Sequence, residues 1–381
     1  MLSDAAYMDC ALFLAGRARG RTTPNPLVGA VVVTPAGVVA GTGYHERAGA
    51  PHAEVHALRA AGDAARGSTL YCTLEPCSHV GRTPPCVDGI LGAGVRRVVA
   101  AVQDPDPRVA GRGVQQLRQA GVQVDVGVGG DAAVRLNRPF FSVMQRGRPF
   151  VIAKAATSLD GRVAAAPGAG PRMSSAPADR RSQSLRAEVD AIAIGSATLL
   201  VDDPRLTVRE VFRERPLARV IFDRRLRTRP SARVFATRTA GPIIIVTTAA
   251  GMADDSAAAR ALEGAGAMLI AVREGVSGAL AALLPLGIHS VLLEGGPTLQ
   301  AAFWREHVVD AVRLIVTPRV AGPGGVPWLD GSQVPWATLA HVEVQPCGDD
   351  TLIEADVYWT DRTRGPCGGT GSHRGRLPVL D

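Results

Sequence analysis

The chain has 381 residues, of which 46% are apolar and 20% charged, and its formal net charge at pH 7 is +7. This length favours two domains, and the apolar fraction excludes a chain that is disordered as a whole. No apolar run reaches the roughly 18 residues of a membrane span, and the N-terminus lacks the basic start and apolar stretch of a signal peptide. We therefore expect a cytoplasmic protein with no membrane partner.

Helices and strands alternate along the first part of the chain. Apolar residues at helical spacing predict an amphipathic helix over residues 3–20, and two apolar runs predict a strand pair at 27–33 and 37–45. The elements expected next are a helix at 52–65, a strand at 68–76, a helix at 86–94, a strand at 95–102, a helix at 113–121 and a strand at 122–128. This alternation indicates an α/β domain with a largely parallel sheet.

A second α/β domain is expected after a short helix and turn over residues 136–148. We place the boundary there, with domains at 1–146 and 147–359. A strand begins near residue 150, and the other expected elements are strands at 191–196, 219–223, 242–248, 267–272, 290–296 and 310–318 and helices near 177–187, 277–286 and 297–306. Residues 360–381 are rich in Gly and Arg without periodicity, which predicts a disordered tail.

Three segments of the first domain carry residues of the types that ligate zinc. His52 opens a predicted helix in PHAEVHAL, Cys77 follows a predicted strand, and Cys86 opens the next helix. One imidazole and two thiolates leave a fourth zinc position open for water, and zinc deaminases add a glutamate that moves protons, here Glu54. The cysteine spacing is C-x8-C instead of C-x2-C. His56 is a rival ligand, and two buried cysteines with a surface histidine are the structural alternative.

Lys154 is the only lysine among 42 basic residues. In a chain that otherwise uses arginine, an ammonium group indicates a role that guanidinium cannot fill. The positive charge is spread along the chain, which favours anionic small-molecule substrates over nucleic acid. A deaminase of nucleic acid, and a second domain that only supports oligomerisation, are the alternatives.

Other local patterns suggest binding or capping. In SVLLEGGPTLQAAF a glycine turn separates a strand from a helix, which suits phosphate binding by backbone amides, although no G-x-G-x-x-G supports a two-half dinucleotide fold. Asp160 is expected to cap the turn at Gly161. Asn25 lies between two prolines, where its amide suits either a base edge or a turn.

The amino-acid sequences of several segments resemble those of one family. PNPLVGAV (24–31), GYHERAGAPHAEVHAL (43–58) and TLEPCSHVGRTPPC (73–86) closely resemble the deaminase domain of the bifunctional riboflavin-biosynthesis deaminase/reductase. The resemblance resumes in KAATSLDGR, LRAEVDAIAIGSATLLVDDPRLTVR and LLEGGPTL. It implies a cytidine-deaminase-like α/β/α domain followed by a dihydrofolate-reductase-like domain that uses NADPH, in a homo-oligomer.

The resemblance also implies an activity. The first domain would deaminate 2,5-diamino-6-(5-phosphoribosylamino)pyrimidin-4(3H)-one with Zn²⁺, and the second would reduce the ribosyl group to ribityl. It implies the zinc ligands His52, Cys77 and Cys86 with Glu54 as proton shuttle. The family's motif contains Lys154, and our hypothesis is that this lysine polarises or protonates the sugar oxygen during hydride transfer.

Binding residues follow from the same resemblance. The implied substrate positions are Asn25, His45, His79, Arg82, Gly170, Arg186, Leu206, Arg209 and Glu294. The implied NADPH positions are Ala156, Thr198, Asp202, Gly296, Pro297, Thr298, Leu299, Gln300, Ala301 and Ala302. Arg172 and Arg224 depart from the family pattern, which has an aromatic and a small hydroxyl residue there.

Overall fold

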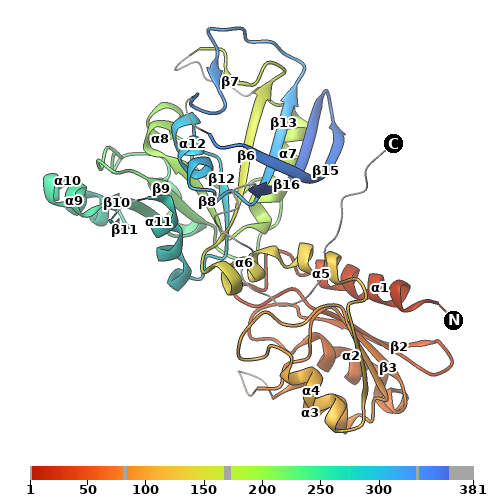
Figure 1. Ribbon diagram of the computed structural model, residues 1–381. Coiled ribbons are helices and arrows are strands. Elements are labelled where there is room, and N and C mark those ends of the chain that lie inside the picture. The colour runs from red at the N-terminus through yellow and green to blue at the C-terminus, as the bar shows by residue number, and fades with distance from the viewer. Residues whose placement is uncertain (1, 80–83, 167–172, 274, 332–333, 360–381) are drawn as a thin grey trace.

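Figure 1 shows the computed structural model, which describes residues 2–79, 84–166, 173–273, 275–331 and 334–359. Within these residues the strands form a five-stranded sheet, a nine-stranded sheet and a two-stranded ribbon. The predictions for Arg82, Gly170, Arg172 and the tail at 360–381 lie outside the described residues. Among the described helices, none combines the length and apolar character needed to cross a bilayer.

The five-stranded sheet has the order β2-β1-β3-β4-β5. Its strands are β1 (Gly29–Val33), β2 (Val39–Tyr44), β3 (Thr69–Cys72), β4 (Arg97–Ala100) and β5 (Gln123–Val126). β1 pairs antiparallel with β2 and β3, whereas β3, β4 and β5 run parallel. The predicted strand pair is confirmed. The largely parallel arrangement holds only for the last three strands, because the short turn after β1 returns the chain antiparallel.

Helices cover both faces of this sheet, so every residue of β1 is buried. Alternate side chains of β1 face opposite layers: Val31 packs with α1 and Val32 with α2. A Cβ on Gly29 would lie 2.0 Å from the carbonyl oxygen of Ala11, so only glycine permits α1 to approach this closely. The helices are α1 (Asp4–Gly16), α2 (Ala53–Ala61), α3 (Cys86–Gly92), α4 (Arg112–Gln119), α5 (Gly130–Leu136) and α6 (Arg138–Arg146).

The nine-stranded sheet has the order β11-β10-β9-β8-β12-β6-β13-β16-β15. Its strands are β6 (Phe150–Ser158), β8 (Ala191–Gly195), β9 (Ala218–Phe222), β10 (Ile243–Thr248), β11 (Ala267–Val272), β12 (Ser290–Leu293), β13 (Ala311–Thr317), β15 (Ala337–Cys347) and β16 (Asp350–Trp359). The strands from β11 to β13 are parallel, and β16 and β15 continue the sheet antiparallel. β7 (Arg162–Ala164) and β14 (Val326–Pro327) form the ribbon.

Two apolar layers lie on the faces of this sheet. One joins Val151 and Ala153 to α11 and α12, and the other joins Phe150 and Ile152 to α8 and α10. The helices are α7 (Ala176–Glu188), α8 (Ser196–Asp202), α9 (Ala249–Asp254), α10 (Ser256–Gly264), α11 (Val276–Leu283) and α12 (Pro297–Arg305). Strands with both faces covered are continuous apolar runs, which explains why most of them were recognisable in the sequence.

Helix α6 lies between the two sheets (Figure 1) and contacts both. Toward the first, the side chain of Asn137, just before α6, accepts from Leu27 N (2.7 Å) and donates to Leu27 O (2.9 Å). Toward the second, Arg138 forms an ion pair with Asp356 and Arg146 one with Asp310. The Asp310 carboxylate also accepts from Arg148 at 2.7 and 2.8 Å.

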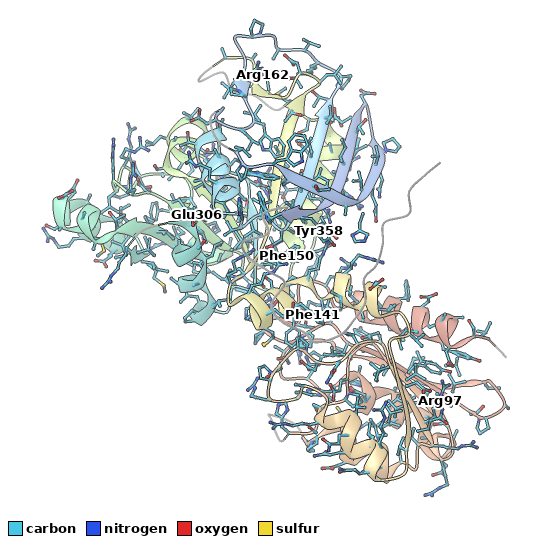
Figure 2. All side chains as sticks on the ribbon, viewed as in Figure 1. Arg97, Phe141, Phe150, Arg162, Glu306 and Tyr358 are labelled. Carbon is cyan, nitrogen blue, oxygen red and sulfur yellow. The ribbon has the colours of Figure 1, made fainter. Side chains whose placement is uncertain are left out.

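Aromatic side chains also mark this junction. Phe141 of α6 packs against Leu74, on the side of the five-stranded sheet. Phe150 is the first residue of β6 in the nine-stranded sheet. The Cζ atom of Arg138 lies over its ring, 5.2 Å from the ring centroid. Figure 2 shows both rings where the two sheets meet.

Several predicted elements differ from the structure. The helix predicted at 3–20 ends at Gly16, and the strand predicted at 68–76 ends at Cys72, after which the chain turns toward Pro76. Strands β15 and β16 and helices α8, α9 and α10 were not predicted. Most residues of β15 are exposed or half-buried because it is the edge strand, so it lacks the apolar pattern of a core strand.

Candidate functional site

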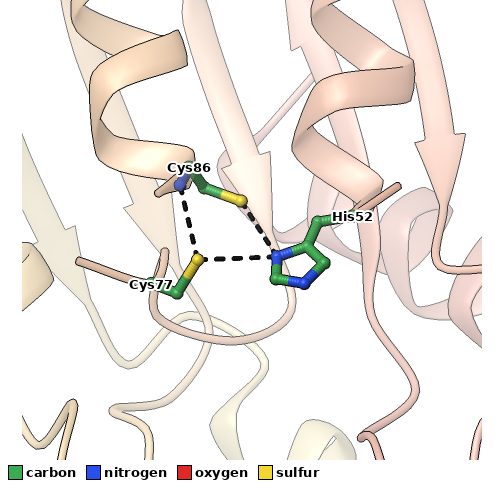
Figure 3. Close-up of side chains that lie close together, drawn as sticks. All are labelled: His52, Cys77 and Cys86. Atoms are coloured by element: carbon green, nitrogen blue, oxygen red, sulfur yellow. Dashed lines mark hydrogen bonds between the residues drawn. The ribbon is translucent and has the colours of Figure 1, made fainter. Parts of the chain in front are cut away.

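Three side chains converge between the beginnings of α2 and α3 (Figure 3). The Nδ1 atom of His52 lies 3.2 Å from Cys86 Sγ and 3.5 Å from Cys77 Sγ. The three donor atoms all lie within 4.8 Å of one another. One imidazole nitrogen and two sulfurs suit tetrahedral zinc and leave one position open. The residues therefore fit a catalytic zinc ion despite the C-x8-C spacing.

These three side chains are positioned by the beginnings of two helices and by the segment after a strand. His52 is the extended residue before α2, and Cys86 is the first residue of α3, after Pro85. Cys77 comes from the segment after β3, where its sulfur accepts from Cys86 N at 3.3 Å and its carbonyl accepts from Val87 N at 3.2 Å. The group of possible ligands does not include His56, the rival candidate, whose buried Nε2 has no partner among the described residues.

The hydrogen bond between the two thiols shifts their pKa values in opposite directions. The pKa of Cys77 is lowered to about 4, because the Cys86 thiol and then the His52 ring donate to its sulfur. The pKa of Cys86 is raised, because its thiol gives that hydrogen bond and is buried. Thiolate and neutral imidazole are the ligating forms, so a divalent cation would displace the protons that the cluster holds.

Glu54 lies on the first turn of α2 beside this cluster. Its side chain is buried, and its Oε2 atom has no hydrogen-bond partner among the described residues. Burial raises its pKa. A buried carboxyl with an unpaired oxygen next to a possible metal site is suited to accept and return a proton.

Asn25 and His45 form a polar pair next to the cluster. Asn25 Nδ2 lies 3.0 Å from His45 Nε2, and the His45 ring packs edge-on to the His52 ring at 5.6 Å. Burial lowers the pKa of His45, and its Nδ1 donates to the carbonyl of Pro51 at 3.1 Å. Neutral His45 then accepts from Asn25, which fixes the amide. His79 is half-buried, with an unpartnered Nδ1 among the described residues.

Glu75 is a buried carboxylate that sequence reasoning missed. It accepts from three backbone amides: Val114 N at 3.1 Å, Asp104 N at 3.1 Å and Gly111 N at 2.9 Å. Glu75 thereby ties the segment around residues 104–114 to the chain that carries Cys77. In the sequence Glu75 is marked only by its place before Pro-Cys in TLEPC, three residues after β3, and this place does not indicate which groups its buried carboxylate contacts.

The second constellation lies at the carboxyl end of β12, beside the middle of β6 in the nine-stranded sheet. Glu294 directly follows β12, whose Leu293 pairs with Ala153 of β6, so Glu294 and Lys154 are neighbours. Arg186 of α7 donates to both oxygens of Glu294, with Nε at 3.1 Å from Oε1. Burial would raise the pKa of Glu294, but the charges of Arg186 and Lys154 outweigh it and hold that pKa below its usual value.

Thr198 and Gly296 meet beside this constellation. Thr198 Oγ1 accepts from Gly296 N at 3.0 Å, and Gly296 caps the start of α12. The start of a helix after a Gly-Gly turn at the edge of a sheet is suited to bind pyrophosphate, so these residues fit a dinucleotide. Gln300 is fully buried and donates to the carbonyls of Lys154 and Leu293, both at 3.2 Å, so its side chain braces β6 against β12.

The remaining predicted residues occupy varied positions. Ala156 is half-buried on β6, Asp202 is exposed at the end of α8, and Arg224 is exposed. Leu206 is buried, and it lines a cavity of about 390 Å³ together with Arg186 and Arg209. The other predicted residues of the α12 turn and helix are Pro297, Thr298, Leu299, Ala301 and Ala302.

Asp160 binds a more distant segment than expected. Besides accepting from Ser158 Oγ at 2.6 Å, its carboxylate accepts from Ala321 N at 3.0 Å and Gly322 N at 2.8 Å. It therefore holds the chain after β13 and is not confined to the turn at Gly161.

Comparisons with known proteins match both parts of the chain. The family model described as the cytidine and deoxycytidylate deaminase zinc-binding region matches residues 1–102, and that of the RibD C-terminal domain matches residues 149–353. The riboflavin biosynthesis protein RibD of Aquifex aeolicus is 42% identical over 84% of this chain and 88% of its own length. That of Escherichia coli is 40% identical over 91% and 98%. The chain belongs to the RibD family.

Solved structures support this assignment. The RibD of Acinetobacter baumannii is 34% identical, with a TM-score of 0.84 over 93% of this chain and 99% of its own. A diaminohydroxyphosphoribosylaminopyrimidine deaminase/5-amino-6-(5-phosphoribosylamino)uracil reductase of Thermotoga maritima is 32% identical, with a TM-score of 0.81 over 93% and 98%. Like other RibD proteins, this chain is a bifunctional riboflavin-biosynthesis enzyme with a deaminase and a reductase part. The predicted family, fold class and activity are confirmed.

Proposed function

We propose that the first part of the chain deaminates 2,5-diamino-6-(5-phosphoribosylamino)pyrimidin-4(3H)-one and that the second part reduces the product to 5-amino-6-(5-phosphoribitylamino)uracil. The observation that carries the first step is the group of His52, Cys77 and Cys86 beside the unpaired carboxyl oxygen of Glu54. The Thermotoga maritima relative, which is named for both activities, supports the substrate. We also propose the domain limits 1–146 and 147–359.

In the deaminase site, His52, Cys77 and Cys86 would hold Zn²⁺. Zinc, when bound, supplies a Lewis acid that makes water a nucleophile near neutral pH. Glu54 Oε2 takes a proton from the attacking water and returns it to the departing amino nitrogen, so that ammonia leaves. Asn25 and His45 bind the pyrimidine, since the amide held by His45 can pair with a base edge, and His79 and Arg82 complete the proposed pocket.

In the reductase site, NADPH, when bound, would supply the hydride. Lys154 donates a proton or hydrogen bond to the sugar oxygen, and Glu294 beside it balances the charge of the lysine and orients the substrate. The proposed NADPH positions are Ala156, Thr198, Asp202, Gly296, Pro297, Thr298, Leu299, Gln300, Ala301 and Ala302. The proposed substrate positions are Gly170, Arg186, Leu206, Arg209 and Glu294.

A paired assay on the purified protein tests both steps. With the diaminopyrimidine phosphate we expect ammonia release followed by NADPH oxidation, and Glu54→Gln should abolish ammonia release while its zinc content equals that of the unchanged protein. Lys154→Arg should retain ammonia release and lose at least tenfold in reductase turnover. Glu263→Gln, at an exposed position of α10, is the matched control. Full deaminase turnover in Glu54→Gln, or full reductase turnover in Lys154→Arg, would refute the assigned role.

A further inference from the structure

The cavity beside Glu294 has a strongly basic lining. It measures about 390 Å³ and is lined by Arg186, Pro204, Arg205, Leu206, Arg209 and Arg233. Four of these six residues carry a guanidinium group, and the lining contains no carboxylate. Arg205 and Arg233 have no role in the reduction as proposed so far. A concave surface with this charge favours an anionic ligand.

Arg186 supplies little of the charge that such a ligand would meet. Its Nε and Nη2 groups donate to the buried Glu294 carboxylate, and its Nη1 donates to the carbonyl of Thr207 at 3.2 Å. The positive charge of Arg186 is therefore already balanced inside the protein. The guanidinium groups of Arg205, Arg209 and Arg233 form no hydrogen bond or ion pair within the described part of the chain. The charge of Arg209 helps to lower the pKa of Glu294, whereas Arg205 and Arg233 have no paired carboxylate there.

The loop that presents Arg205 and Arg209 is held in an unusual conformation. Asp203, Leu206 and Glu210 have positive φ values of 39°, 52° and 63°, which is unfavourable for residues other than glycine. Such conformations persist where surrounding contacts impose them, and they concentrate at binding sites.

Two contacts hold this loop. Arg209 N donates to Gln183 Oε1 of α7 at 2.9 Å, and Arg233 N donates to Asp203 Oδ1 at 2.8 Å. The second contact fixes the backbone of Arg233 to the loop while leaving its guanidinium available. The cavity is thus assembled from α7 and from two loops that are far apart in the sequence.

We propose that Arg205 and Arg233, together with Arg209, bind the terminal phosphate of the sugar phosphate that the reductase part converts. A phosphate monoester carries a charge of about −1.5 to −2 at pH 7 and accepts bidentate hydrogen bonds from guanidinium groups. Arg209 alone cannot balance that charge, and Arg186 is paired with Glu294. This assignment rests on the proposed function and adds two specificity-determining residues to it.

The 2′-phosphate of NADPH is also a phosphate monoester that arginines could bind. The experiment must therefore distinguish binding of the substrate's phosphate from binding of the cofactor's phosphate. Steady-state kinetics of Arg205→Ala and Arg233→Ala would be measured with 5-amino-6-(5-phosphoribosylamino)uracil, with its dephosphorylated form, and with NADPH or NADH. We expect the KM for the phosphorylated substrate to rise about tenfold in each variant, with kcat nearly unchanged. The KM for the dephosphorylated substrate and for NADPH should not change. Arg229→Ala, at an exposed position of the same loop as Arg233, is the control.

Inorganic phosphate gives a second readout that does not need turnover. It should raise the melting temperature of the unchanged protein and of Arg229→Ala, but not that of the double variant Arg205→Ala/Arg233→Ala. If the KM for the phosphorylated substrate is unchanged in Arg205→Ala and Arg233→Ala, the proposal is wrong. It is also wrong if these variants have a higher KM for NADPH and no longer prefer NADPH over NADH. Absence of NADPH oxidation by the unchanged protein refutes the proposed function instead. In that case the melting temperatures still test the anion site. If phosphate raises the melting temperature of the double variant as much as that of the unchanged protein, Arg205 and Arg233 do not form an anion site.

Discussion

Glu75 offers the most direct test of how the proposed zinc ligands are positioned. In Glu75→Gln, the amide oxygen can replace Oε2 and keep the hydrogen bonds from Asp104 N and Gly111 N. The new NH₂ group then faces Val114 N, which loses its acceptor. Hydrogen bonds to a charged group contribute about 1.5–3 kcal/mol each. Losing one of them and weakening two should lower the free energy of unfolding of the deaminase part by about 3 kcal/mol.

The assay can follow the two parts separately. Zinc release into a chromogenic chelator reports the deaminase part during urea unfolding. Tryptophan fluorescence reports the reductase part, because Trp304, Trp328, Trp336 and Trp359 all lie there. We expect Glu75→Gln to release zinc at lower urea concentration while the tryptophan transition stays in place. Asp131→Asn removes an exposed carboxylate of α5 and should change neither. Zinc release at the same urea concentration as in the unchanged protein would refute a bracing role of Glu75.

Two further predictions concern groups away from both sites. Arg219 is fully buried and donates to Thr237 O at 3.1 Å and to Gly241 O, and burial lowers its pKa to about 10. Arg219→Met should therefore cost about 2–4 kcal/mol by leaving buried carbonyls unpaired, and an unchanged urea midpoint by tryptophan fluorescence would contradict this. Hydrogen bonds from Arg97 and Tyr71 lower the pKa of Asp4 to about 2. Because the folded pKa lies below the unfolded value of about 3.9, this contribution to stability is complete above about pH 4 and is lost as the pH falls toward 2. Asp4→Asn should be less stable at neutral pH, and its stability should depend less on pH between pH 4 and 2. Acid unfolding of the variant and of the unchanged protein, both with chelator present, measures this. Identical acid transitions would count against the pairing of Asp4 with Arg97 and Tyr71.

The convergence of His52, Cys77 and Cys86 could be predicted because these residues lie at or near the ends of secondary-structure elements. His52 precedes a helix and Cys86 begins one, so both signals survive in the local sequence even with the long cysteine spacing. Glu75 could not be recognised in this way. Its three amide partners lie about 30 to 40 residues further along the chain, and no local pattern indicates that they meet its carboxylate.

Arginine-rich composition hides part of the reductase site. Lys154 was recognisable because it is the only lysine, whereas Arg205 and Arg233 are two among many arginines and only the fold brings them together. Strands β15 and β16 escaped prediction for a different reason. They extend the sheet at its edge, where few side chains need to be apolar.

The contacts of α6 bear on whether the two enzymes can be produced separately. A cut before Asn137 would deprive Leu27 of both hydrogen bonds from that side chain. A cut after Arg146 would leave Asp356 without Arg138 and remove one of the two arginines from Asp310, whose side chain is 2% exposed. Since breaking a largely buried ion pair on one side strands a charge in the interior, either fragment inherits a defect. Dividing the gene into two independent enzymes would therefore require duplication of this helix, or replacement of its charged partners, at the new ends.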